Sequence, residues 1–502
     1  MATLTTPAAG LAVASTREQV CRTALRWIAG VVVLGLLGHF IVLLWAQHEF
    51  TPVEPLVVLH SNMFVRGEGL YWGMNRYPYT ISAYGPIFYA VSGSLHSLGV
   101  PAYQSGRLLA FAALLTSLWL CWLCVGYVSP SRHARVAGLI LAASTSNTLF
   151  WGTTGQVDLL GCCFSLAAIA AFLKFRECGE VRALALSGVF VILAVFTKQT
   201  FVSAGVAIAL TLLWEDRKRA AAWIGGVGLA GAAIAFGLNT LTHGGFFEDA
   251  IFANINPFAW SKLGQQAQYL TLTGVGLILT AAVGAWYMSS RTAPLYLYAG
   301  LATGVWLATA PKIGSDLNYQ VEMMLALSIC AGCALDRLDF FGSLFTSRRT
   351  WVTLLQMPLL LHVALNVLLT FRVIAERAIL EPVRAQETAA LTPYVSKAGR
   401  VLSVQYDSLV HLRGRIEIEP LIYSLLVRAG LTNPAPLLRD LETRQFAIVI
   451  LGEDISAPPP AERDLEYGTL TDAQLGAVRD NYKLVRKVDG PTNAYVYEPR
   501  ND

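Results

Sequence analysis

Charged and polar side chains stand at the ends of several long apolar stretches of this chain. The first is Glu54, within TPVEPLVVLHSNMFVRGEGLYW (residues 51–72). A carboxylate in such a place can take a proton or hold a cation. A charge in such a place is costly unless it serves a pocket or a partner. The set comprises Glu54, Arg66, Glu68, Arg76, Gln156, Asp158, Lys198, Lys312, Asp316, Asn318 and Glu322.

Glu54 is the strongest individual candidate for acid–base chemistry. Pro55 suits the first position of a helix, which puts Glu54 at the N-cap. The helix dipole there keeps the carboxylate ionised, ready to accept a proton or to hold a cation. A capping role alone explains the same pattern, and Glu49 is a rival carboxylate five residues earlier. We predict that Glu54 is catalytic and leave both alternatives open.

The composition indicates what surrounds these residues. Of 502 residues, 55% are hydrophobic and only 14% are charged, whereas a soluble domain carries roughly 25% charged residues. Most of the surface therefore faces something other than water, and we predict a polytopic membrane protein. The net charge of +4 is small and no dense Lys/Arg patch exists, which excludes a nucleic-acid partner. The cysteines lie in or beside apolar stretches, where helix packing explains them better than metal or redox chemistry.

Eleven stretches are long and apolar enough to be candidate spans, because a bilayer core about 30 Å thick needs roughly 20 helical residues. With loose ends they are 27–46, 107–128, 135–151, 157–174, 183–197, 199–214, 220–241, 268–288, 294–310, 319–335 and 351–371. A single helix over 183–214 would be about 48 Å long, so we divide it at Lys198. The division also places the basic cluster at 217–219 with the other Lys/Arg-rich loops, which mark the cytoplasmic side.

The predicted fold class is an all-α membrane bundle of about 11 transmembrane helices with interfacial helices at its outer face, followed by a small α/β domain. The segment 84–98 is too short to cross and is predicted to lie at the interface. The domains are a cytoplasmic tail (1–26), a transmembrane domain (27–372, with its first outer loop at 47–106) and the α/β domain (373–502).

The α/β domain is expected outside the cytoplasm, because eleven crossings separate it from a cytoplasmic N-terminus. Strand patterns occupy 401–406, 446–452 and 494–499, and helical patterns lie at 418–430 and 472–482. No recognisable catalytic signature occurs in residues 373–502. The predicted location is a membrane with the N-terminus on its cytoplasmic side.

The layout resembles the GT-C superfamily of polyprenyl-phosphate-dependent glycosyltransferases, which includes the aminoarabinose transferase and the protein O-mannosyltransferases. One span is followed by a long outer loop with an acid, then by GEGLYW, YPYTISAYGPIFY and a second span that begins with Gly106 and Arg107. Further short resemblances are GQVDLL (155–160), TKQT (197–200), FANINPF (252–258) and GSDLNYQVE (314–322).

The resemblance implies transfer of a sugar, a hexose or a pentose, from a polyprenyl-phosphate donor to a glycan, lipid or protein acceptor of the cell envelope. Transfer would occur at the outer face, with inversion at the anomeric carbon. By position, Glu54 would deprotonate or orient the acceptor hydroxyl. Lys198 and Arg76, then Lys312, would stabilise negative charge on the departing lipid phosphate. Tyr84 could donate a hydrogen bond to that phosphate.

The remaining candidates would bind substrate. Gln156 and Asp158 begin a span at the outer side and could bind sugar hydroxyls or only cap the helix. Asn318, Tyr319 and Glu322 lie within about one turn, and the first and last of them share a face. Lining a pocket and plain structural roles explain these residues equally well.

Two departures from the family pattern concern metal and phosphate binding. Many members carry two adjacent acids in the first loop, whereas Val53 precedes Glu54 here. A single carboxylate is a poor site for a divalent cation, so we expect no cofactor and do not favour a metal. The sequence Tyr84-Gly85-Pro86 also replaces a lysine-containing stretch, so another cation would have to neutralise the phosphate.

Two other classes of protein remain as alternatives. A transporter or flippase of lipid-linked saccharides would need polar groups and broken helices at mid-bilayer, whereas mid-span residues here are mostly Leu, Ala, Val and Gly. A non-catalytic envelope scaffold would need no cavity with Glu54 on its wall.

Overall fold

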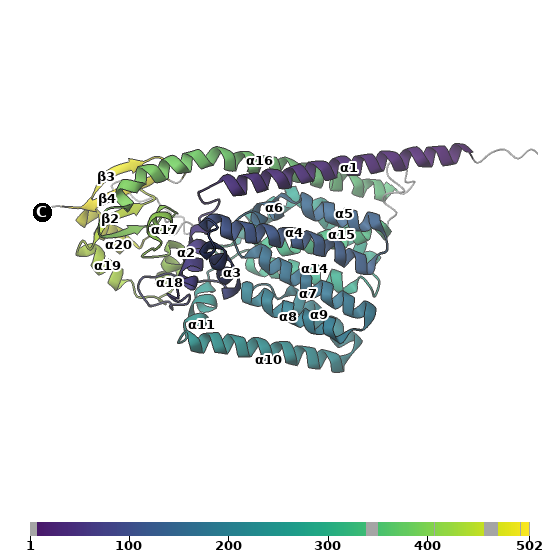
Figure 1. The fold of residues 1–502 in the computed structure, drawn as a ribbon, viewed down its shortest axis with the longest axis horizontal. Helices are drawn as coiled ribbons and strands as arrows, with labels where there is room; N and C mark the ends of the chain where they lie inside the picture. Colours follow the sequence, from purple (N-terminus) through teal and green to yellow (C-terminus); the bar gives the residue numbers. More distant parts are fainter. Residues whose placement is uncertain (1–7, 338–349, 406, 456–469, 492, 501–502) are drawn as a thin grey trace, which may run out of the picture.

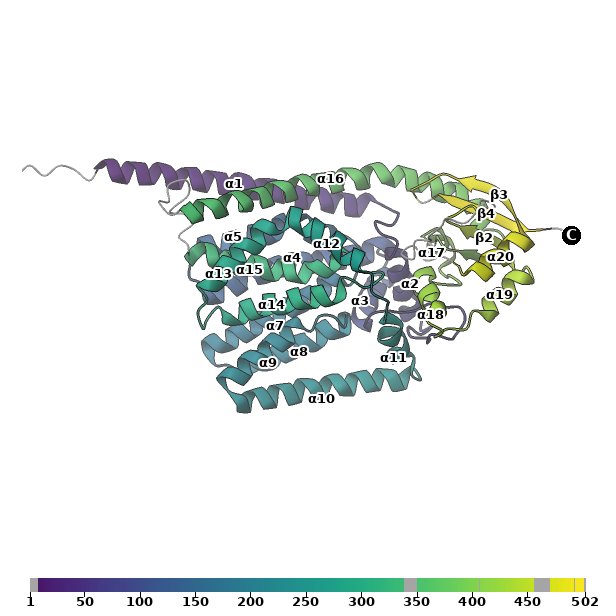
Figure 2. The same ribbon diagram turned by 180° about the vertical axis from the view of Figure 1, so that it is seen from behind.

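The computed structural model describes residues 8–337, 350–405, 407–455, 470–491 and 493–500. A bundle of long helices forms most of the molecule, and a small α/β domain covers one end of it (Figure 1). The N-terminal part of α1 (Ala8–Trp45) extends beyond the other end of the bundle, far from the α/β domain. Three short helices lie between the bundle and the domain, namely α2 (Glu54–Val65), α3 (Pro86–Ser97) and α11 (Gly245–Ala250), as Figure 2 also shows.

The remaining helices of the bundle are α4 (Ala102–Val128), α5 (Arg132–Ser144), α6 (Ser146–Gly152), α7 (Asp158–Cys178), α8 (Val181–Thr197), α9 (Ser203–Glu215), α10 (Arg217–Leu241), α12 (Trp260–Thr273), α13 (Val275–Trp286), α14 (Ala293–Thr309), α15 (Val321–Arg337) and α16 (Thr350–Val395), with the 3₁₀ turns η1 (Phe252–Asn254) and η2 (Leu317–Gln320). Helix α7 packs between α4 and α8, and its Leu166, Ala168 and Phe172 are fully buried. Helices α1 and α16 run side by side along one edge (Figures 1 and 2).

Helices occupy all eleven ranges that the sequence predicts as spans. By length and composition, five of the described helices could cross a membrane, or six if the pair α12 and α13, bent by 80°, counts as one span. The other helices in the predicted ranges have 7 to 17 residues. An apolar membrane protein is therefore supported, whereas the number of eleven crossings stays a prediction.

The chain breaks at Lys198 as the sequence predicts, with extended backbone (φ −151°, ψ 125°) between α8 and α9. The stretch 135–151, predicted as one span, is instead divided into α5 and α6 at Thr145. The backbone N–H and the hydroxyl of Ser146 both donate to Asn366 Oδ1 of α16, each at 3.0 Å. A contact with a distant helix thus replaces a bond within the helix, which the local pattern does not reveal.

The two predicted interfacial segments are the helices α2 and α3. Helix α2 begins at Glu54 and its N-cap is Val53, so Glu54 lies one residue further into the helix than predicted. Pro55 fits the first turn because its missing N–H would have no partner there. At the start of α3, a Cβ on Gly85 would lie 1.8 Å from the Phe196 carbonyl oxygen, so this close approach requires glycine.

The C-terminal domain contains a four-stranded sheet in the order β1-β2-β4-β3. The strands are β1 (Arg400–Ser403), β2 (Phe446–Leu451), β3 (Tyr482–Val488) and β4 (Ala494–Pro499), and the helices are α17 (Asp407–Arg413), α18 (Pro420–Arg428), α19 (Ala435–Glu442) and α20 (Asp472–Asn481). The β1–β2 pair is parallel, with Leu402 opposite Val449, and the other pairs are antiparallel. The three predicted strands are present. The edge strand β3 was not predicted, because five exposed residues between Tyr482 and Val488 leave no apolar alternation.

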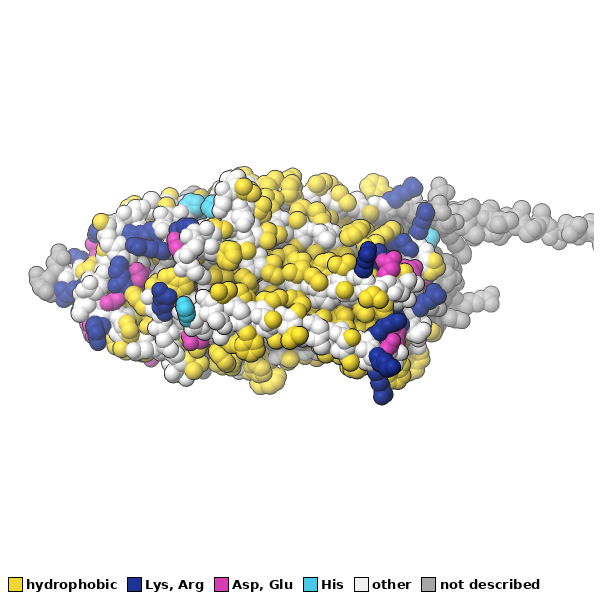
Figure 3. Space-filling view, turned by 60° about the horizontal axis from the view of Figure 1, so that its bottom comes forward, with side chains coloured by type: hydrophobic (Ala, Val, Ile, Leu, Met, Phe, Trp, Pro, Cys, Tyr) yellow, Lys and Arg dark blue, Asp and Glu magenta, His cyan; other side chains and the backbone are white. Residues whose placement is uncertain are grey.

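No break in secondary structure marks residue 372, the predicted end of the transmembrane domain. Helix α16 continues to Val395 and contacts α17 and β3 of the C-terminal domain. The surface nevertheless changes along the molecule. Figure 3 shows hydrophobic side chains across the middle of one face, with most of the charged side chains toward its two ends. This distribution suits a bundle that crosses a bilayer with the C-terminal domain in water.

Candidate active site

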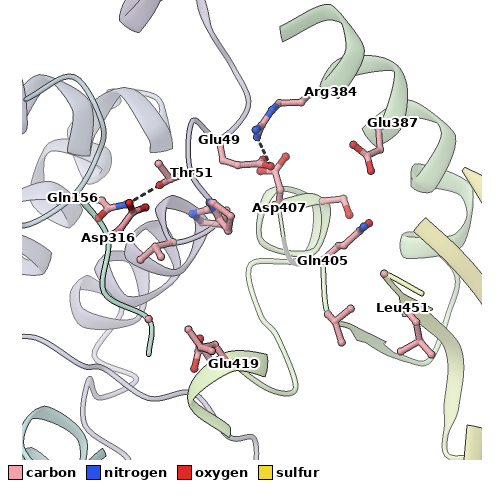
Figure 4. Close-up of a pocket in the computed structure, with 18 of the residues that line it drawn as sticks. Glu49, Thr51, Gln156, Asp316, Arg384, Glu387, Gln405, Asp407, Glu419 and Leu451 are labelled. Atoms are coloured by element: carbon pink, nitrogen blue, oxygen red, sulfur yellow. Dashed lines mark hydrogen bonds and ion pairs between the residues drawn. The ribbon is translucent and has the colours of Figure 1, made fainter. Parts of the chain in front are cut away.

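A cavity of about 930 Å³ lies between the end of the helix bundle and the C-terminal domain. The loop that precedes α2, the turn before η2, α16 and four segments of the domain line it (Figure 4). The charged residues of the lining are Glu49, Lys262, Asp316, Arg384, Glu387, Asp407, Glu419 and Glu453. With six carboxylates and two cations, this wall is predominantly acidic.

Glu49 lies on the cavity wall, in the loop between α1 and α2. It forms an ion pair with Arg384 of α16, and its carboxylate faces that of Asp407 at the start of α17 (Figure 4). Tyr103 of α4 donates its hydroxyl hydrogen to the same Asp407. Burial and the charge of Asp407 raise the pKa of Glu49 well above its ordinary value, although Arg384 opposes this. The carboxyl pair can therefore exchange a proton with a substrate at a higher pH than an exposed carboxylate can.

Glu54 lies behind the cavity wall. Val53 and Pro55 line the cavity, whereas the Glu54 side chain is 0% exposed and points into the bundle. Its Oε1 accepts from Arg107 Nε (2.9 Å) and from the backbone N–H of Gly155 (2.6 Å). Its Oε2 accepts from Arg107 Nη2 (2.9 Å) and from the backbone N–H of Phe50 (2.6 Å).

This bonding keeps Glu54 ionised. Burial favours the neutral acid, but Arg107 and the two backbone N–H groups together hold the pKa of Glu54 below its ordinary value. Each oxygen already accepts two hydrogen bonds, so no free lone pair faces the cavity. In this geometry Glu54 positions the loop and the α6–α7 turn, and a direct role in proton transfer stays a prediction.

Lys198, Asp158 and Asn318 form a second buried polar group at the same end of the bundle. Lys198 Nζ lies 2.8 Å from Asp158 Oδ1, and Asn318 Nδ2 donates to Asp158 Oδ2 at 3.1 Å. The ammonium group also lies 4.2 Å from the ring centre of Tyr319 and 5.2 Å from that of Tyr84. Four separate segments supply these five predicted residues, and two of the five, Tyr84 and Asn318, line the cavity.

Gln156 joins this end of the bundle to the first loop. It lines the cavity, and its Nε2 donates to the hydroxyl of Thr51 at 2.7 Å (Figure 4). Glu322 lies deeper, where it accepts hydrogen bonds from Ser203 (3.1 Å) and Tyr298 (3.2 Å) and does not line the cavity. Glu322 thus stabilises the contact between α9, α14 and α15.

The two other predicted cations lie outside the cavity lining. Arg76 is exposed, and its guanidinium stacks 4.5 Å from the ring centre of Trp72. Lys312 Nζ donates to the Asn254 carbonyl oxygen at 3.3 Å. Burial and the nearby positive charge of Lys198 lower the pKa of Lys312. Lys312 thus feels the charge of Lys198, and Arg76 contacts Trp72 instead.

No motif in the sequence marks the cavity residues that the C-terminal domain and α16 supply. Arg384, Asp407 and Glu419 fall in stretches without a recognisable motif. Only the folded chain brings Arg384 and Asp407 to Glu49 and places Glu419 on the wall of the same cavity. Glu419 caps α18 by accepting from the backbone N–H of Ile422 at 2.8 Å. Burial raises its pKa to about 7, against the effect of these backbone hydrogen bonds. One weak signal was present: a carboxylate immediately before Pro420, at a helix start.

The described residues contain no group of three or more His, Cys, Asp or Glu side chains placed to hold a metal ion. Glu54 would need to release Arg107 or a backbone N–H before it could ligate one. Metal dependence remains open to test, and no step below uses a metal.

The chain folds into a long apolar bundle with short helices at one end and an α/β domain that closes a cavity over them, and other solved structures share this fold. Residues 85–237 match the sequence profile of the dolichyl-phosphate-mannose-protein mannosyltransferase family. No protein of curated function matches the sequence significantly.

Solved structures with this fold cover nearly the whole chain. ArnT from Cupriavidus metallidurans in the apo state is similar with a TM-score of 0.63 and 12% identity over 95% of this chain and 98% of ArnT. The same protein bound to undecaprenyl phosphate gives 0.62 and 13% over 94% and 98%. The archaeal oligosaccharyltransferase AglB from Archaeoglobus fulgidus, with an inhibitory peptide and a dolichol-phosphate, gives 0.55 and 13% over 86% and 69%.

Proposed function

We propose that this protein is an integral-membrane glycosyltransferase that moves a sugar from a polyprenyl-phosphate donor to an acceptor of the cell envelope, at the outer face of a bacterial inner membrane. The observation that carries the proposal is the cavity of about 930 Å³ at the end of a bundle with the GT-C fold. The cavity has both acid–base groups and, beside it, a buried lysine. The complex of ArnT with undecaprenyl phosphate supports a lipid-phosphate donor.

The reaction would be a single displacement. The acceptor hydroxyl attacks the anomeric carbon while its proton passes to a carboxylate of the protein. The bond between that carbon and the phosphate oxygen breaks, and its electron pair leaves with the polyprenyl phosphate. Attack from the side opposite the leaving group inverts the anomeric carbon.

Lys198 and Tyr84 are the proposed groups for the departing phosphate. Negative charge grows on the phosphate as the bond breaks, and a preorganised cation stabilises that charge strongly in a dry site. Lys198 directs one of its three donors to Asp158, so donors remain for a phosphate. Lys312 would strengthen the positive field from the neighbouring loop. Besides the lipid phosphate, the acidic lining of the cavity would repel a second anion. We therefore expect an acceptor that is neutral or positively charged at the reacting group.

Two carboxylates compete for the role of base. Glu54 is the residue indicated by the family resemblance, but its four hydrogen bonds keep it away from the cavity. Glu49 lies on the wall and has a raised pKa. A base with a higher pKa binds the acceptor proton more readily once it is ionised. We therefore assign proton acceptance to Glu49, coupled to Asp407, and a positioning role to Glu54.

The function can be tested in a deletion strain by mass spectrometry of lipid-linked sugars and envelope glycans. We expect a polyprenyl-phosphate sugar to accumulate and one envelope modification to disappear, and wild-type protein should reverse both changes. No change in either pool would contradict the transferase proposal. Movement of labelled lipid across proteoliposomes without an acceptor would instead indicate a transporter.

The choice of base can be tested in the same strain with Glu49→Gln. This variant should be produced at the wild-type level, retain its thermal stability and fail to restore the modification. Asp407→Asn is the companion, and it should lower activity less, because it does not remove the accepting group. Full restoration by Glu49→Gln would exclude Glu49 as the base.

A further inference from the structure

Five buried polar atoms of residues that line the cavity have no hydrogen-bond partner in the described part of the chain, and three of them belong to the charged side chains of Glu49, Arg384 and Glu387. The other two belong to neutral side chains. One is the indole Nε1 of Trp151 and the other is Oδ1 of Asn318. The two side chains are 4% and 7% exposed, and both line the cavity. A buried polar group without a partner costs free energy, so an orphaned pair in a cavity indicates a ligand or bound water.

The orientation of the Asn318 amide follows from its neighbour. Asp158 is ion-paired with Lys198, so its carboxylate is ionised and can only accept. The group 3.1 Å from Asp158 Oδ2 must therefore be the Asn318 amino group. Its Oδ1 is left as an acceptor with no partner. The Trp151 N–H can only donate.

Trp151 and Asn318 belong to neighbouring elements. Trp151 lies on α6, and Asn318 lies on η2. Asn147, one helical turn before Trp151 and on the same face of α6, donates its Nδ2 to the Leu317 carbonyl oxygen at 2.8 Å. This bond holds α6 against η2 at the residue that precedes Asn318. The unpartnered donor and the unpartnered acceptor thus flank one part of the cavity wall.

The chemistry of this pair selects among ligand groups. A phosphate oxygen can accept the Trp151 N–H. It has no hydrogen to donate to Asn318 Oδ1, and the lone pairs of the two oxygens repel each other. An ammonium donates to Asn318 but has nothing to accept the indole hydrogen. A neutral group that both accepts and donates satisfies both atoms at once, and the hydroxyl and acetamido groups of a sugar are such groups.

We propose that Trp151 and Asn318 form a subsite for one hydroxyl or acetamido group of the transferred sugar, which accepts from Trp151 Nε1 and donates to Asn318 Oδ1. The proposal rests on the proposed function and adds a sugar-recognition site to it. Asp158 and Lys198 are the positioning residues, because their ion pair fixes the orientation of the Asn318 amide. The same ammonium group would then hold the lipid phosphate beside the sugar.

The experiment compares the affinity of purified protein for undecaprenyl phosphate with that for undecaprenyl phosphate carrying glucose, galactose, mannose or N-acetylglucosamine. In the wild type, at least one sugar-bearing lipid should bind more tightly than the bare phosphate lipid. In Trp151→Phe this advantage should fall about three- to ten-fold, the worth of one hydrogen bond, while the affinity for undecaprenyl phosphate stays unchanged. A chain with benzothienylalanine at position 151 keeps the shape of the indole, lacks its N–H and should behave in the same way.

Trp306→Phe is the matched control. Trp306 is equally buried, but its Nε1 donates to Gln266 Oε1 at 2.9 Å. Both changes remove buried ring atoms, but only Trp306→Phe also breaks a hydrogen bond within the protein. Trp306→Phe should therefore lower the melting temperature more than Trp151→Phe and leave the sugar advantage intact.

The failures of the two proposals are distinguishable. If the wild type prefers a sugar-bearing lipid and both changes at position 151 keep that preference, the subsite is wrong and water alone occupies it. The subsite is also wrong if undecaprenyl phosphate binds and no sugar adds affinity. Failure of the wild type to bind any of these lipids would contradict the proposed function and this inference with it.

Discussion

Glu54 and Arg107 form a two-pronged ion pair, with both nitrogen–oxygen distances at 2.9 Å, in which neither side chain has any exposed surface. Arg107 also stacks 3.7 Å from the ring centre of Phe50. The pair ties the first loop to α4, and the Gly155 N–H ties it to the turn before α7. The residue that the sequence singles out for chemistry is therefore the one that holds the first loop and the α6–α7 turn together.

Glu54→Gln should destabilise the protein because it leaves the Arg107 guanidinium buried without a counter-charge. The expected loss is about 3–5 kcal/mol, the cost of breaking a buried pair from one side. Thermal unfolding in detergent measures it. Glu49→Gln is the matched control. Because Glu49 is partly exposed, this substitution should lower the free energy of unfolding far less. A stable, correctly folded Glu54→Gln protein without activity would restore Glu54 as the catalytic base.

Single and double substitutions can distinguish a structural role of the Lys198–Asp158 ion pair from a functional role of Lys198. Lys198→Met leaves a buried carboxylate unpaired, so it should lower both stability and transfer. The double variant Lys198→Met, Asp158→Asn removes both charges and keeps an acceptor for the Asn318 amino group. We expect the double variant to regain thermal stability and to remain inactive. Recovery of transfer in the double variant would show that the lysine only balances Asp158.

Arg76→Ala should leave transfer within about two-fold of the wild type, because an exposed side chain outside the cavity carries little binding energy. Its guanidinium contacts Trp72 and faces solvent. Initial rates in membrane vesicles provide the measurement, with Lys198→Met alongside as the variant expected to fail. A large loss with Arg76→Ala would mean that the loop between α2 and α3 closes over the substrate.

Stability should fall as the pH rises through the range in which Glu419 titrates. Burial raises its pKa from the ordinary 4.5 to about 7. Below pH 4.5 the folded and unfolded chains both hold the proton, so its stabilising effect is complete. Between the two values only the folded chain holds the proton, so stability declines by up to roughly 3 kcal/mol and levels off above pH 7.

Unfolding midpoints between about pH 5 and pH 8 test this dependence. Glu419→Gln keeps the oxygen that accepts from Ile422 and cannot ionise, so it should flatten the curve. Glu442→Gln, a change at an exposed carboxylate of α19, should not alter it. An equal slope in wild type and Glu419→Gln would exclude Glu419 as its source.

The sequence by itself determined the elements of this protein. Apolar length located the helices, and the position of Lys198 in a stretch too long for one span located the break between α8 and α9. Pro55 marked the start of α2, and the short apolar segment 84–98 located α3. These features depend on hydrophobic periodicity and on local backbone chemistry, and both can be read directly from the amino-acid sequence.

The tertiary structure decided which polar groups meet. Only the fold sets Arg107 against Glu54, brings Asp407 to Glu49 from the far end of the chain and divides 135–151 at Thr145 through a bond to Asn366. It also decided that Val53 and Pro55, and not Glu54 between them, face the cavity. The partner of a buried charge is chosen by geometry among residues distant in sequence, because burial makes an unpaired charge too costly to keep.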